Sequence, residues 1–439
     1  MLSKRLTPPQ LLVAGFAAVI LIGAVLLTTP WAVKNGSGQF LTSLFTSTSA
    51  VCVTGLVVVD TGTHWTIGGQ IVILFLMQIG GLGIMSFATF FALLLGKKIQ
   101  LRERLLMQQA LGKTSLEGIV AIFRYLLLFS FTIEFIAALI MAGNWAPVMG
   151  FGNALWFGLF HAVSAFNNCG MDLFGGFRSL TGYSLDVVTN LVISSLIVIG
   201  GLGFVVLYEL YHYRQSHSLS VHTRIVLVTT AILISVGTFL ILGLEYNHSL
   251  KDLPFYGKVM AAYFQSISPR TAGFNTIDLT AMIVPTQLVI IMLMFIGGSP
   301  GSTAGGVKTS TFALMWAAII SLLKGKKDTE IFRRRIPYND VLTALSIIIM
   351  ALSFIMLMAW LLSFTNHFSF LRLLFEVTSA MGTVGLSLGL TPHLDTWGRI
   401  LIIVTMFVGR LGPLTIGYAL AYREKQVDIT YPEGKVMIG

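Results

Sequence analysis

Four short segments of this 439-residue chain each end in a glycine whose backbone could help to bind a dehydrated cation. In each segment an aromatic residue stands ten positions before the glycine, with small and hydroxyl-bearing residues between them, and a large apolar residue follows. The segments are residues 45–55, 160–170, 263–273 and 375–385. Backbone carbonyls can replace the water around a cation, and the turn that presents several of them to one axis favours glycine.

We therefore predict that each glycine and the two residues before it line a selectivity filter. These residues are Val53, Thr54, Gly55, Asn168, Cys169, Gly170, Thr271, Ala272, Gly273, Thr383, Val384 and Gly385. No carboxylate occurs within three residues before any of the glycines, which argues against an acidic ring for divalent ions. A short helix before each glycine would direct its negative C-terminal end at the ion. A turn or close-packing role is the alternative for any one glycine.

A second glycine-rich motif follows each segment, at residues 79–83, 199–203, 296–301 and 408–412. The third copy continues into a stretch with five glycines and a proline, which we predict to be a mobile loop at membrane depth. Its residues are Gly297, Gly298, Ser299, Pro300, Gly301, Ser302, Thr303, Ala304, Gly305 and Gly306. Each glycine costs a helix about 1 kcal/mol and an interior proline about 3 kcal/mol. We expect a loop below the filter that can obstruct the pathway; a kinked packing helix is the alternative.

Arg410 replaces a glycine in the fourth copy of this motif. A charge deep in a membrane span costs at least about 2.5 kcal/mol, so such a side chain should face the pathway or bind exposed carbonyls. We predict that Arg410 binds the free carbonyls of this loop, holds the loop in a closed position and raises the barrier to cations. An arginine that reaches from a helix end to the membrane surface is the alternative.

The composition excludes a soluble protein. The chain has 28 Lys and Arg against 18 Asp and Glu, a net charge of +10, and 55% hydrophobic residues. Only 10% of its residues are charged, against about 25% in soluble domains, and its mean hydropathy is +0.84. The bases gather near residues 97–113, 214–224 and 324–335, which the positive-inside rule places in the cytoplasm with both termini. Their dispersal excludes nucleic acid as a partner.

The apolar segments that must position the glycines recur at the same intervals as the glycine segments. A long apolar run precedes each glycine segment, at residues 11–27, 119–142, 225–244 and 341–364. The segments themselves are too short to cross a bilayer as helices, and three crossings per unit would put successive basic linkers on opposite faces. We expect each segment to enter the membrane and return, which requires cover by protein or water.

The predicted fold is an all-α integral membrane protein with eight transmembrane helices. They form four repeats of span, P-loop and span, with pseudo-fourfold symmetry around one pore. The predicted boundaries are 1–98, 99–216, 217–325 with a broken second span, and 326–422, followed by a cytoplasmic tail at 423–439. We expect free buried thiols at Cys52 and Cys169, packing for His161, and anchoring of span ends for Arg124 and Glu134.

Three strings carry a family resemblance: Ser-Ala-Val-Cys-Val-Thr-Gly-Leu at 49–56, Arg-Thr-Ala-Gly-Phe-Asn at 270–275 and Gly-Arg-Leu-Gly-Pro at 409–413. With the four repeats, they resemble the superfamily of K⁺ transporters that includes the Trk, Ktr and plant HKT proteins. The first repeat begins almost at residue 1, which is more similar to the membrane subunits of bacterial Ktr systems than to TrkH. In plant members a serine in the first filter goes with Na⁺ preference, so Gly55 implies K⁺.

The resemblance implies more about partners and regulation. It implies K⁺ as the substrate, Na⁺ as a possible activator, a homodimer with one pore per subunit, and the gating role of the intramembrane loop. It also implies a cytosolic KtrA-like regulatory ring that binds ATP, ADP or NAD, with no cofactor on this chain. A Na⁺ or ammonium pathway, or a K⁺/Na⁺ symporter of the same fold, stays open. The motifs of intramembrane enzymes are missing from the sequence, so we expect no enzyme.

Overall fold

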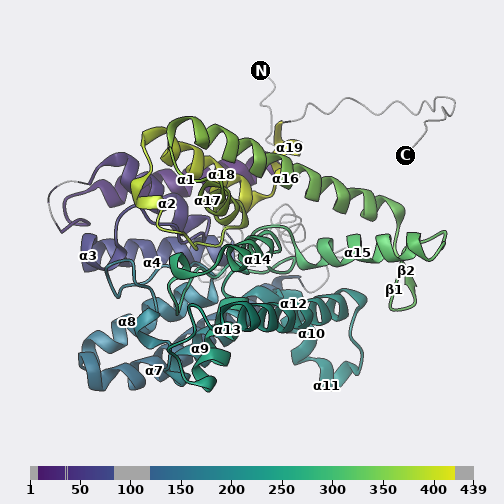
Figure 1. The fold of residues 1–439 in the computed structure, drawn as a ribbon, viewed down its shortest axis with the longest axis horizontal. Helices are drawn as coiled ribbons and strands as arrows, with labels where there is room; N and C mark the ends of the chain where they lie inside the picture. The colour runs from purple at the N-terminus through teal and green to yellow at the C-terminus, as the bar shows by residue number, and fades with distance from the viewer. Residues whose placement is uncertain (1–7, 35, 37, 84–118, 421–439) are drawn as a thin grey trace.

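The computed structural model describes residues 8–34, 36, 38–83 and 119–420, which fold into packed helices (Figure 1). Four helices are long and apolar enough to cross a membrane. They are α1 (Pro8–Thr28), α7 (Ile119–Met149), α12 (Val221–Glu245) and α16 (Tyr338–Thr365). The bent pair α9 and α10 meets the same test when it is taken as one span. Each long helix carries one of the apolar runs that the sequence analysis identified.

A short helix returns along each long helix and leads to one of the predicted filter glycines. These helices are α2 (Phe40–Val51), α8 (Phe151–Phe166), α13 (Phe255–Ile267) and α17 (Phe370–Gly382). Each packs against the long helix that precedes it in the chain. Their C-terminal halves are buried, so their final carbonyls point into the centre of the molecule.

A second set of helices runs back from the glycine segments: α4 (Ile67–Leu82), α9 (Val187–Leu202), α14 (Val284–Phe295) and α18 (Thr396–Leu411). Three of them begin at a capping side chain, since Thr66, Asp186 and Asp395 accept hydrogen bonds from backbone N–H groups of the first turn. The fourth, α14, instead has a proline in its first turn. Sequence-local signals therefore fix where these helices start.

The second helices break at glycines, and the break in the third repeat is much longer than the others. Helix α9 bends by 100° into α10 (Phe204–Tyr211) at Gly203, which has a φ of +94°. Gly412, with a φ of +83°, separates α18 from α19 (Pro413–Leu420). In the third repeat residues 296–308 separate α14 from α15 (Thr309–Leu323). The sequence analysis identified the third break and missed the bends at Gly203 and Gly412.

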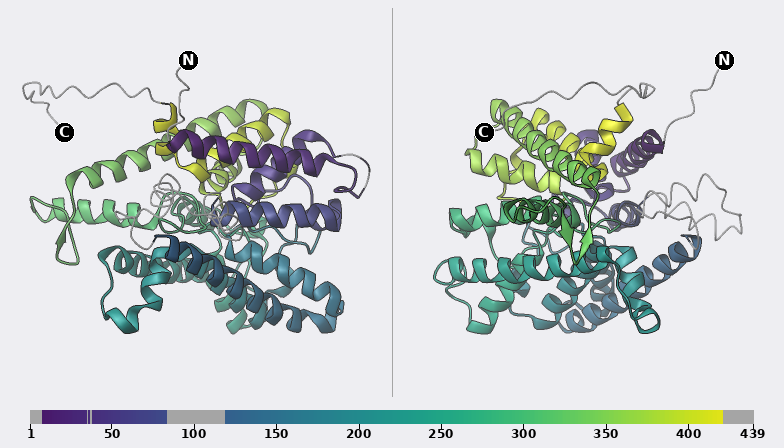
Figure 2. Two further views of the ribbon diagram at one scale, coloured as in Figure 1. Left: turned by 180° about the vertical axis from the view of Figure 1, so that it is seen from behind. Right: turned by 90° about the vertical axis from the view of Figure 1, so that its right-hand side faces the viewer.

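A few short elements complete the described fold. They are α3 (Thr61–His64), α11 (Tyr213–Ser216), and single 3₁₀ turns at Thr181–Tyr183, Leu279–Ala281 and Thr391–His393. Strands β1 (Glu330–Ile331) and β2 (Arg334–Arg335) pair antiparallel beyond α15 (Figure 2), which departs from the all-α prediction. The hairpin forms within the predicted basic linker, where the ion pair Arg335–Asp328 links its two arms and Lys326 pairs with Glu330 on the first arm.

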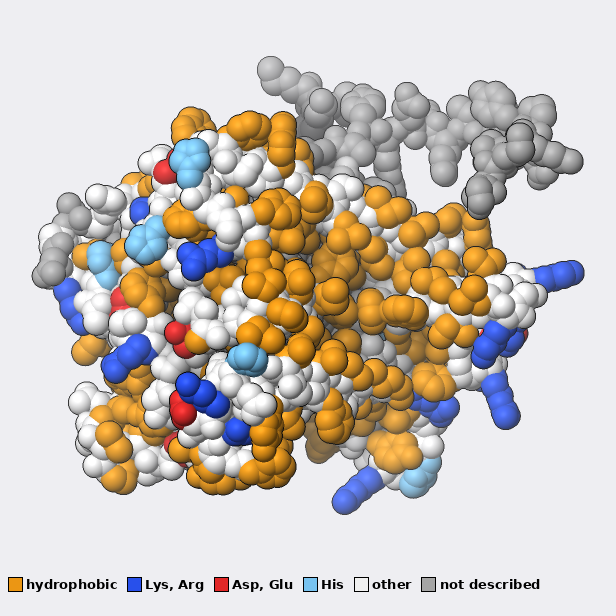
Figure 3. Space-filling view, viewed as in Figure 1, with side chains coloured by type: hydrophobic (Ala, Val, Ile, Leu, Met, Phe, Trp, Pro, Cys, Tyr) orange, Lys and Arg blue, Asp and Glu red, His pale blue; other side chains and the backbone are white. Residues whose placement is uncertain are grey.

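Hydrophobic side chains cover the middle of the surface between two charged ends (Figure 3). Many of them are exposed on the long helices, such as Val25 on α1, Phe239 on α12 and Trp360 on α16. Soluble monomers do not expose apolar bands of this extent, whereas a protein surrounded by lipid must. The surface agrees with the composition: the chain is a multi-pass membrane protein.

Candidate ion filter and gate

The four predicted glycines lie side by side at the centre of the molecule, in the order of the chain. A Cβ atom on Gly55 would lie 1.9 Å from the carbonyl oxygen of Cys169, and one on Gly170 would lie 2.5 Å from that of Ala272. The corresponding distances are 2.4 Å from Gly273 to the Val384 oxygen and 2.3 Å from Gly385 to the Thr54 oxygen. The fourth segment thus returns to the first, and the segments close into a ring that excludes any side chain at the glycines.

In each filter segment, residues with a positive φ alternate with a residue whose φ is not in the left-handed region. The residue two before each glycine has a positive φ: 55° at Val53, 57° at Asn168, 76° at Thr271 and 51° at Thr383. The glycines have φ values of 78° to 96°, while the residue between each pair is not in this region. Such alternation turns successive carbonyls to one side. Because three of the first set are β-branched, the ring stores strain of about 1–3 kcal/mol per residue, which is typical of functional sites.

Serines at or near the ends of the short helices hold all four strained segments in place; in the third, the N–H of Ala272 donates to the Ser268 carbonyl at 2.9 Å. The backbone N–H groups of Thr54, Cys169 and Val384 donate to the carbonyls of Ser49, Ser164 and Ser379, at 2.7, 2.8 and 2.8 Å. The Ser164 hydroxyl also donates to the carbonyl of Met171 at 2.8 Å, and the Ser379 hydroxyl accepts from Gly385 N–H at 3.1 Å. The sequence analysis missed these serines, although the hydroxyl residues before each glycine were the signal.

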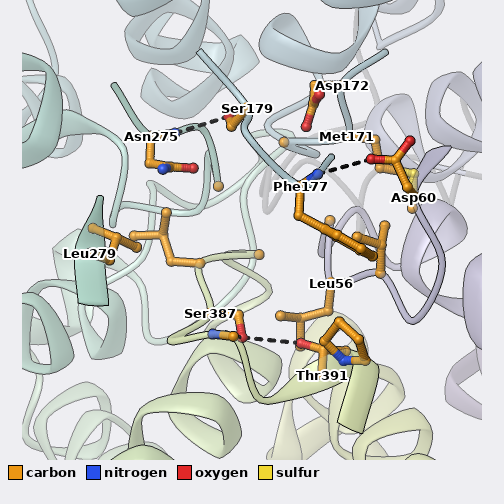
Figure 4. Close-up of a pocket in the computed structure, with 18 of the residues that line it drawn as sticks. Leu56, Asp60, Met171, Asp172, Phe177, Ser179, Asn275, Leu279, Ser387 and Thr391 are labelled. Atoms are coloured by element: carbon orange, nitrogen blue, oxygen red, sulfur yellow. Dashed lines mark hydrogen bonds between the residues drawn. The ribbon is translucent and has the colours of Figure 1, made fainter. Parts of the chain in front are cut away.

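A cavity of about 400 Å³ opens on one side of the ring (Figure 4), and all four glycines contribute to its lining. The carboxylates of Asp60, Asp172 and Asp278 face it as well. Asp60 accepts a hydrogen bond from Phe177 N–H at 2.9 Å, which joins the first two repeats. Burial, together with the nearby charge of Asp60, raises the pKa of Asp172 to about 7. Above that pH the cavity concentrates cations in front of the ring.

The loop of the third repeat, residues 296–308, lies on the other side of the ring. The Thr303 hydroxyl donates to the Phe166 carbonyl at 3.1 Å and lies 3.1 Å from the amide of Asn168, a predicted filter residue. A Cβ on Gly305 would lie 2.1 Å from the Thr383 hydroxyl oxygen. The loop therefore contacts two of the four filter segments. Its glycines permit this close approach.

Two half-buried cationic side chains bind the loop. Arg410 donates to the carbonyls of Thr303, Gly80 and Gly81, and so joins the loop to the end of α4. Lys308 Nζ donates to the carbonyl of Ala304 at 2.7 Å and contacts that of Gly305 at 3.5 Å. The sequence analysis predicted the contact of Arg410 with the loop but assigned no role to Lys308. The sequence feature that could have indicated this role is a basic residue close after the glycine-rich stretch.

The structure confirms some of the remaining sequence predictions and contradicts one of them. Cys52 and Cys169 are free, buried thiols. The ring of His161 packs near Trp145 and Phe174, as expected of a packing residue. Glu134 does not anchor a helix end, because its buried carboxylate lies between three helices. The side chain of Arg124 lies outside the described residues. Within the described part of the chain, no three His, Cys, Asp or Glu side chains gather in a way that could hold a metal ion.

Long apolar helices, four short helices that pack along them, and a ring of glycines and backbone carbonyls beside a carboxylate-lined cavity are typical of a membrane transport protein for ions. The chain belongs to the TrkH family, described as cation transport protein, which it matches over residues 7–426. This confirms the resemblance read from the motifs. Membership in a family of transport proteins also agrees with the prediction that the chain is no enzyme.

Three relatives match almost end to end. The chain is 44% identical over 437 residues to the Ktr system potassium uptake protein B of Bacillus subtilis, covering 99% of this chain and 97% of the relative. It is 39% identical over 436 residues to the protein of the same name from Vibrio alginolyticus, covering 98% and 95%. It is 38% identical over 444 residues to the potassium/sodium uptake protein NtpJ of Enterococcus hirae, covering 99% and 98%.

The fold matches a solved structure. The crystal structure of the potassium transporter TrkH from Vibrio parahaemolyticus superposes with a TM-score of 0.77 at 17% sequence identity. The match covers 96% of this chain and 86% of that chain. At this level of identity the likeness concerns the fold, which is of the TrkH type.

Proposed function

We propose that this chain is the K⁺-translocating subunit of a Ktr-type uptake system in the cell membrane. The observation that carries the proposal is the closed ring of Gly55, Gly170, Gly273 and Gly385, where each glycine meets a carbonyl of the next repeat. The oxygens of a carbonyl ring can take the place of the hydration shell of a monovalent cation. Such a ring carries no fixed negative charge. The ends of α2, α8, α13 and α17 add the negative ends of four helix dipoles. K⁺ moves down its electrochemical gradient.

The loop at 297–306 is the gate in this proposal. It lies directly against the filter at Asn168 and Thr383, and the carbonyls that its break leaves free are bound by Arg410 and Lys308. The two cationic side chains oppose the passage of K⁺ because they occupy carbonyl oxygens that K⁺ would bind and because they repel it. Opening requires the loop to leave these partners.

The proposed topology has eight spans around one pseudo-fourfold pore, with both termini in the cytoplasm. The four long helices supply one span per repeat, and each second helix, with its continuation where one is described, supplies the other. The basic hairpin after α15 belongs to the cytoplasmic end, and the carboxylate-lined cavity opens outside. A cation then meets the cavity, the ring and the loop in that order.

Regulation by partners rests on the family rather than on contacts in this chain. Two relatives are named as components of a Ktr system. We propose that two copies of this chain form a homodimer and that a cytosolic KtrA-like ring, which binds ATP, ADP or NAD, moves the gate. Na⁺ acts as an activator.

Growth rescue tests the proposal. A host that lacks its own K⁺ uptake systems should grow at low K⁺ when it expresses this chain with its regulatory ring. Gly55→Ser and Gly273→Ser should lose K⁺ selectivity or rescue, because a side chain at either position meets a carbonyl. Gly152→Ala is the control, since a Cβ there meets nothing within 4 Å. An expressed wild-type protein that fails to rescue would overturn the assignment.

A Na⁺-conducting pathway is the second candidate, favoured by the relative named as a potassium/sodium uptake protein. Competition separates it from the K⁺ pathway. Excess K⁺ should suppress Rb⁺ uptake through this chain, whereas excess Na⁺ or ammonium should not. Suppression by Na⁺ equal to that by K⁺ would favour the Na⁺ pathway, and suppression by ammonium would favour an ammonium pathway.

A further inference from the structure

One buried carboxylate of the described residues does not line the cavity and has no part in the site described above. Glu134 sits within the apolar stretch Leu127–Met149 of α7 and is only 3% exposed. Two primary amides from neighbouring helices donate to it. Gln78 Nε2 on α4 lies 3.1 Å from each carboxylate oxygen, and Asn167 Nδ2 at the end of α8 lies 3.1 Å from Oε1. Asn167 also donates to Gln78 Oε1 at 2.8 Å.

The described elements around Glu134 offer it no positive charge. Helices α4 and α9, which pack close by, carry no ionisable side chain. His161 on α8 contacts Trp145 and Phe174 instead, and Glu209 on α10 binds Thr223. Arg410 reaches the carbonyls of Gly80 and Gly81 on α4. An ionised carboxylate with only neutral donors at this depth is costly, so a bound proton stabilises the site.

The cluster contacts the filter and the gate through backbone neighbours. Asn167 directly precedes the filter residue Asn168. A Cβ on Gly81 would lie 2.1 Å from Asn167 Oδ1, and the Gly81 carbonyl accepts a hydrogen bond from Arg410 at 3.2 Å. A rotation of the Asn167 amide therefore alters the position of the second filter segment and of the carbonyls that Arg410 binds.

We propose that Glu134 is a proton-binding site that sets the rate of ion passage. A proton from water bonds to one carboxylate oxygen, and the side-chain charge changes from −1 to 0. The O–H group of protonated Glu134 must donate a hydrogen bond, so it needs an acceptor where the ionised carboxylate needed an amide N–H donor. Asn167 Oδ1, which is buried and has no hydrogen-bond partner among the described residues, can supply it once the amide turns. The effect on ion passage rests on the proposed function, whereas the binding of the proton does not.

Infrared difference spectroscopy of the purified full-length protein in lipid tests the binding directly. Between mildly alkaline and mildly acidic pH, the wild type should gain the C=O stretch of a protonated carboxylic acid, shifted in D₂O. Glu134→Gln should lose that contribution, and Glu134→Asp should move it. Glu245→Gln should keep it, because the partners of Glu245 are the backbone N–H groups of Ser249 and Ile283. If Glu134→Gln does not fold, the shift in Glu134→Asp decides.

Rb⁺ uptake into proteoliposomes at saturating Rb⁺ tests the consequence. The maximal rate of the wild type should change several-fold with pH, and that of Glu134→Gln should stay constant, while Glu245→Gln follows the wild type. Spectra of wild type and Glu134→Gln that are identical at every pH would overturn the proton site. A chain with the Glu134 band but no Rb⁺ uptake at any pH, even with its regulatory ring, would instead overturn the proposed function.

Discussion

The two sides of the glycine ring differ in the sign of the charges that the described residues place there. On the cavity side stand three carboxylates, Asp60, Asp172 and Asp278. On the loop side stand two cations, Lys308 and Arg410, which are bound to backbone carbonyls. The carboxylates face open space and attract ions from water. In the proposed function the cations occupy oxygens that a passing ion would need, so that the cavity side would collect ions and the loop side would restrain them.

This difference gives an order of expected effects. The ring separates the two sides and should tolerate the least change, because four segments support one another there. The loop-side cations should come next, since each holds the gate through a few hydrogen bonds. The carboxylates should matter least, because several of them act together at longer range.

The largest effect is expected at the ring itself. Gly170→Ala places a methyl group 2.5 Å from the Ala272 carbonyl oxygen and 2.7 Å from the Gly273 Cα, at a φ of +78°. Neither backbone atom can yield without opening the ring, so Rb⁺ uptake should be lost while the protein still reaches the membrane. Gly152→Ala, on the exposed side of α8, should keep wild-type uptake. Normal K⁺ selectivity in Gly170→Ala would show that the ring is not the filter.

Arg410→Ala should release the gate. Hydrogen bonds to a charged group contribute about 1.5–3 kcal/mol each, so losing the bonds to Thr303, Gly80 and Gly81 should raise the open population about tenfold or more. The maximal rate of Rb⁺ uptake without the regulatory ring should rise accordingly. Arg399→Ala is matched because Arg399 lies on the same helix and binds the Leu394 carbonyl. An unchanged rate in Arg410→Ala would contradict the gating role.

Lys308→Met should act in the same direction but more weakly. It removes one close hydrogen bond, to the Ala304 carbonyl, and keeps the apolar length of the side chain. Since Lys308 is only half-buried and loses a single close hydrogen bond, the gain in rate should be about two- to fivefold. Lys324→Met, at the exposed end of α15, should leave the rate unchanged. A loss of uptake in Lys308→Met would assign Lys308 to the open state instead.

The sequence predicted the central glycines and the broken helix of the third repeat because both features depend on glycine. A glycine repeated in four similar contexts, and five more near one proline, indicate close approach and broken helix whatever the surroundings. The positive φ of Val53, Thr271 and Thr383 could not be predicted, because β-branched residues are ordinarily extended and only the closed ring imposes that strain. The Gln78–Glu134–Asn167 cluster also went unpredicted, since it joins three helices from two repeats.

The long helices were predictable from their apolar runs, whereas the bends at Gly203 and Gly412 were not. Each of these glycines stands in a motif that also contains helical glycines, such as Gly200 and Gly409. Within helices those two make close contact with the carbonyls of Phe166 and Met381. Glycine thus serves close packing and chain reversal a few residues apart, and only the contacts distinguish the two uses.

The smallest effect is expected on the cavity side, and it depends on pH. Because the pKa of Asp172 is raised to about 7, its carboxylate is ionised above that pH and neutral below it. Asp172→Asn should therefore raise the K⁺ concentration for half-maximal uptake roughly two- to fivefold at alkaline external pH and leave it unchanged at acidic pH. The maximal rate should not move. Kinetics of Rb⁺ uptake at several external pH values check this, and a shift that persists in acid would assign Asp172 a packing role instead of an electrostatic one.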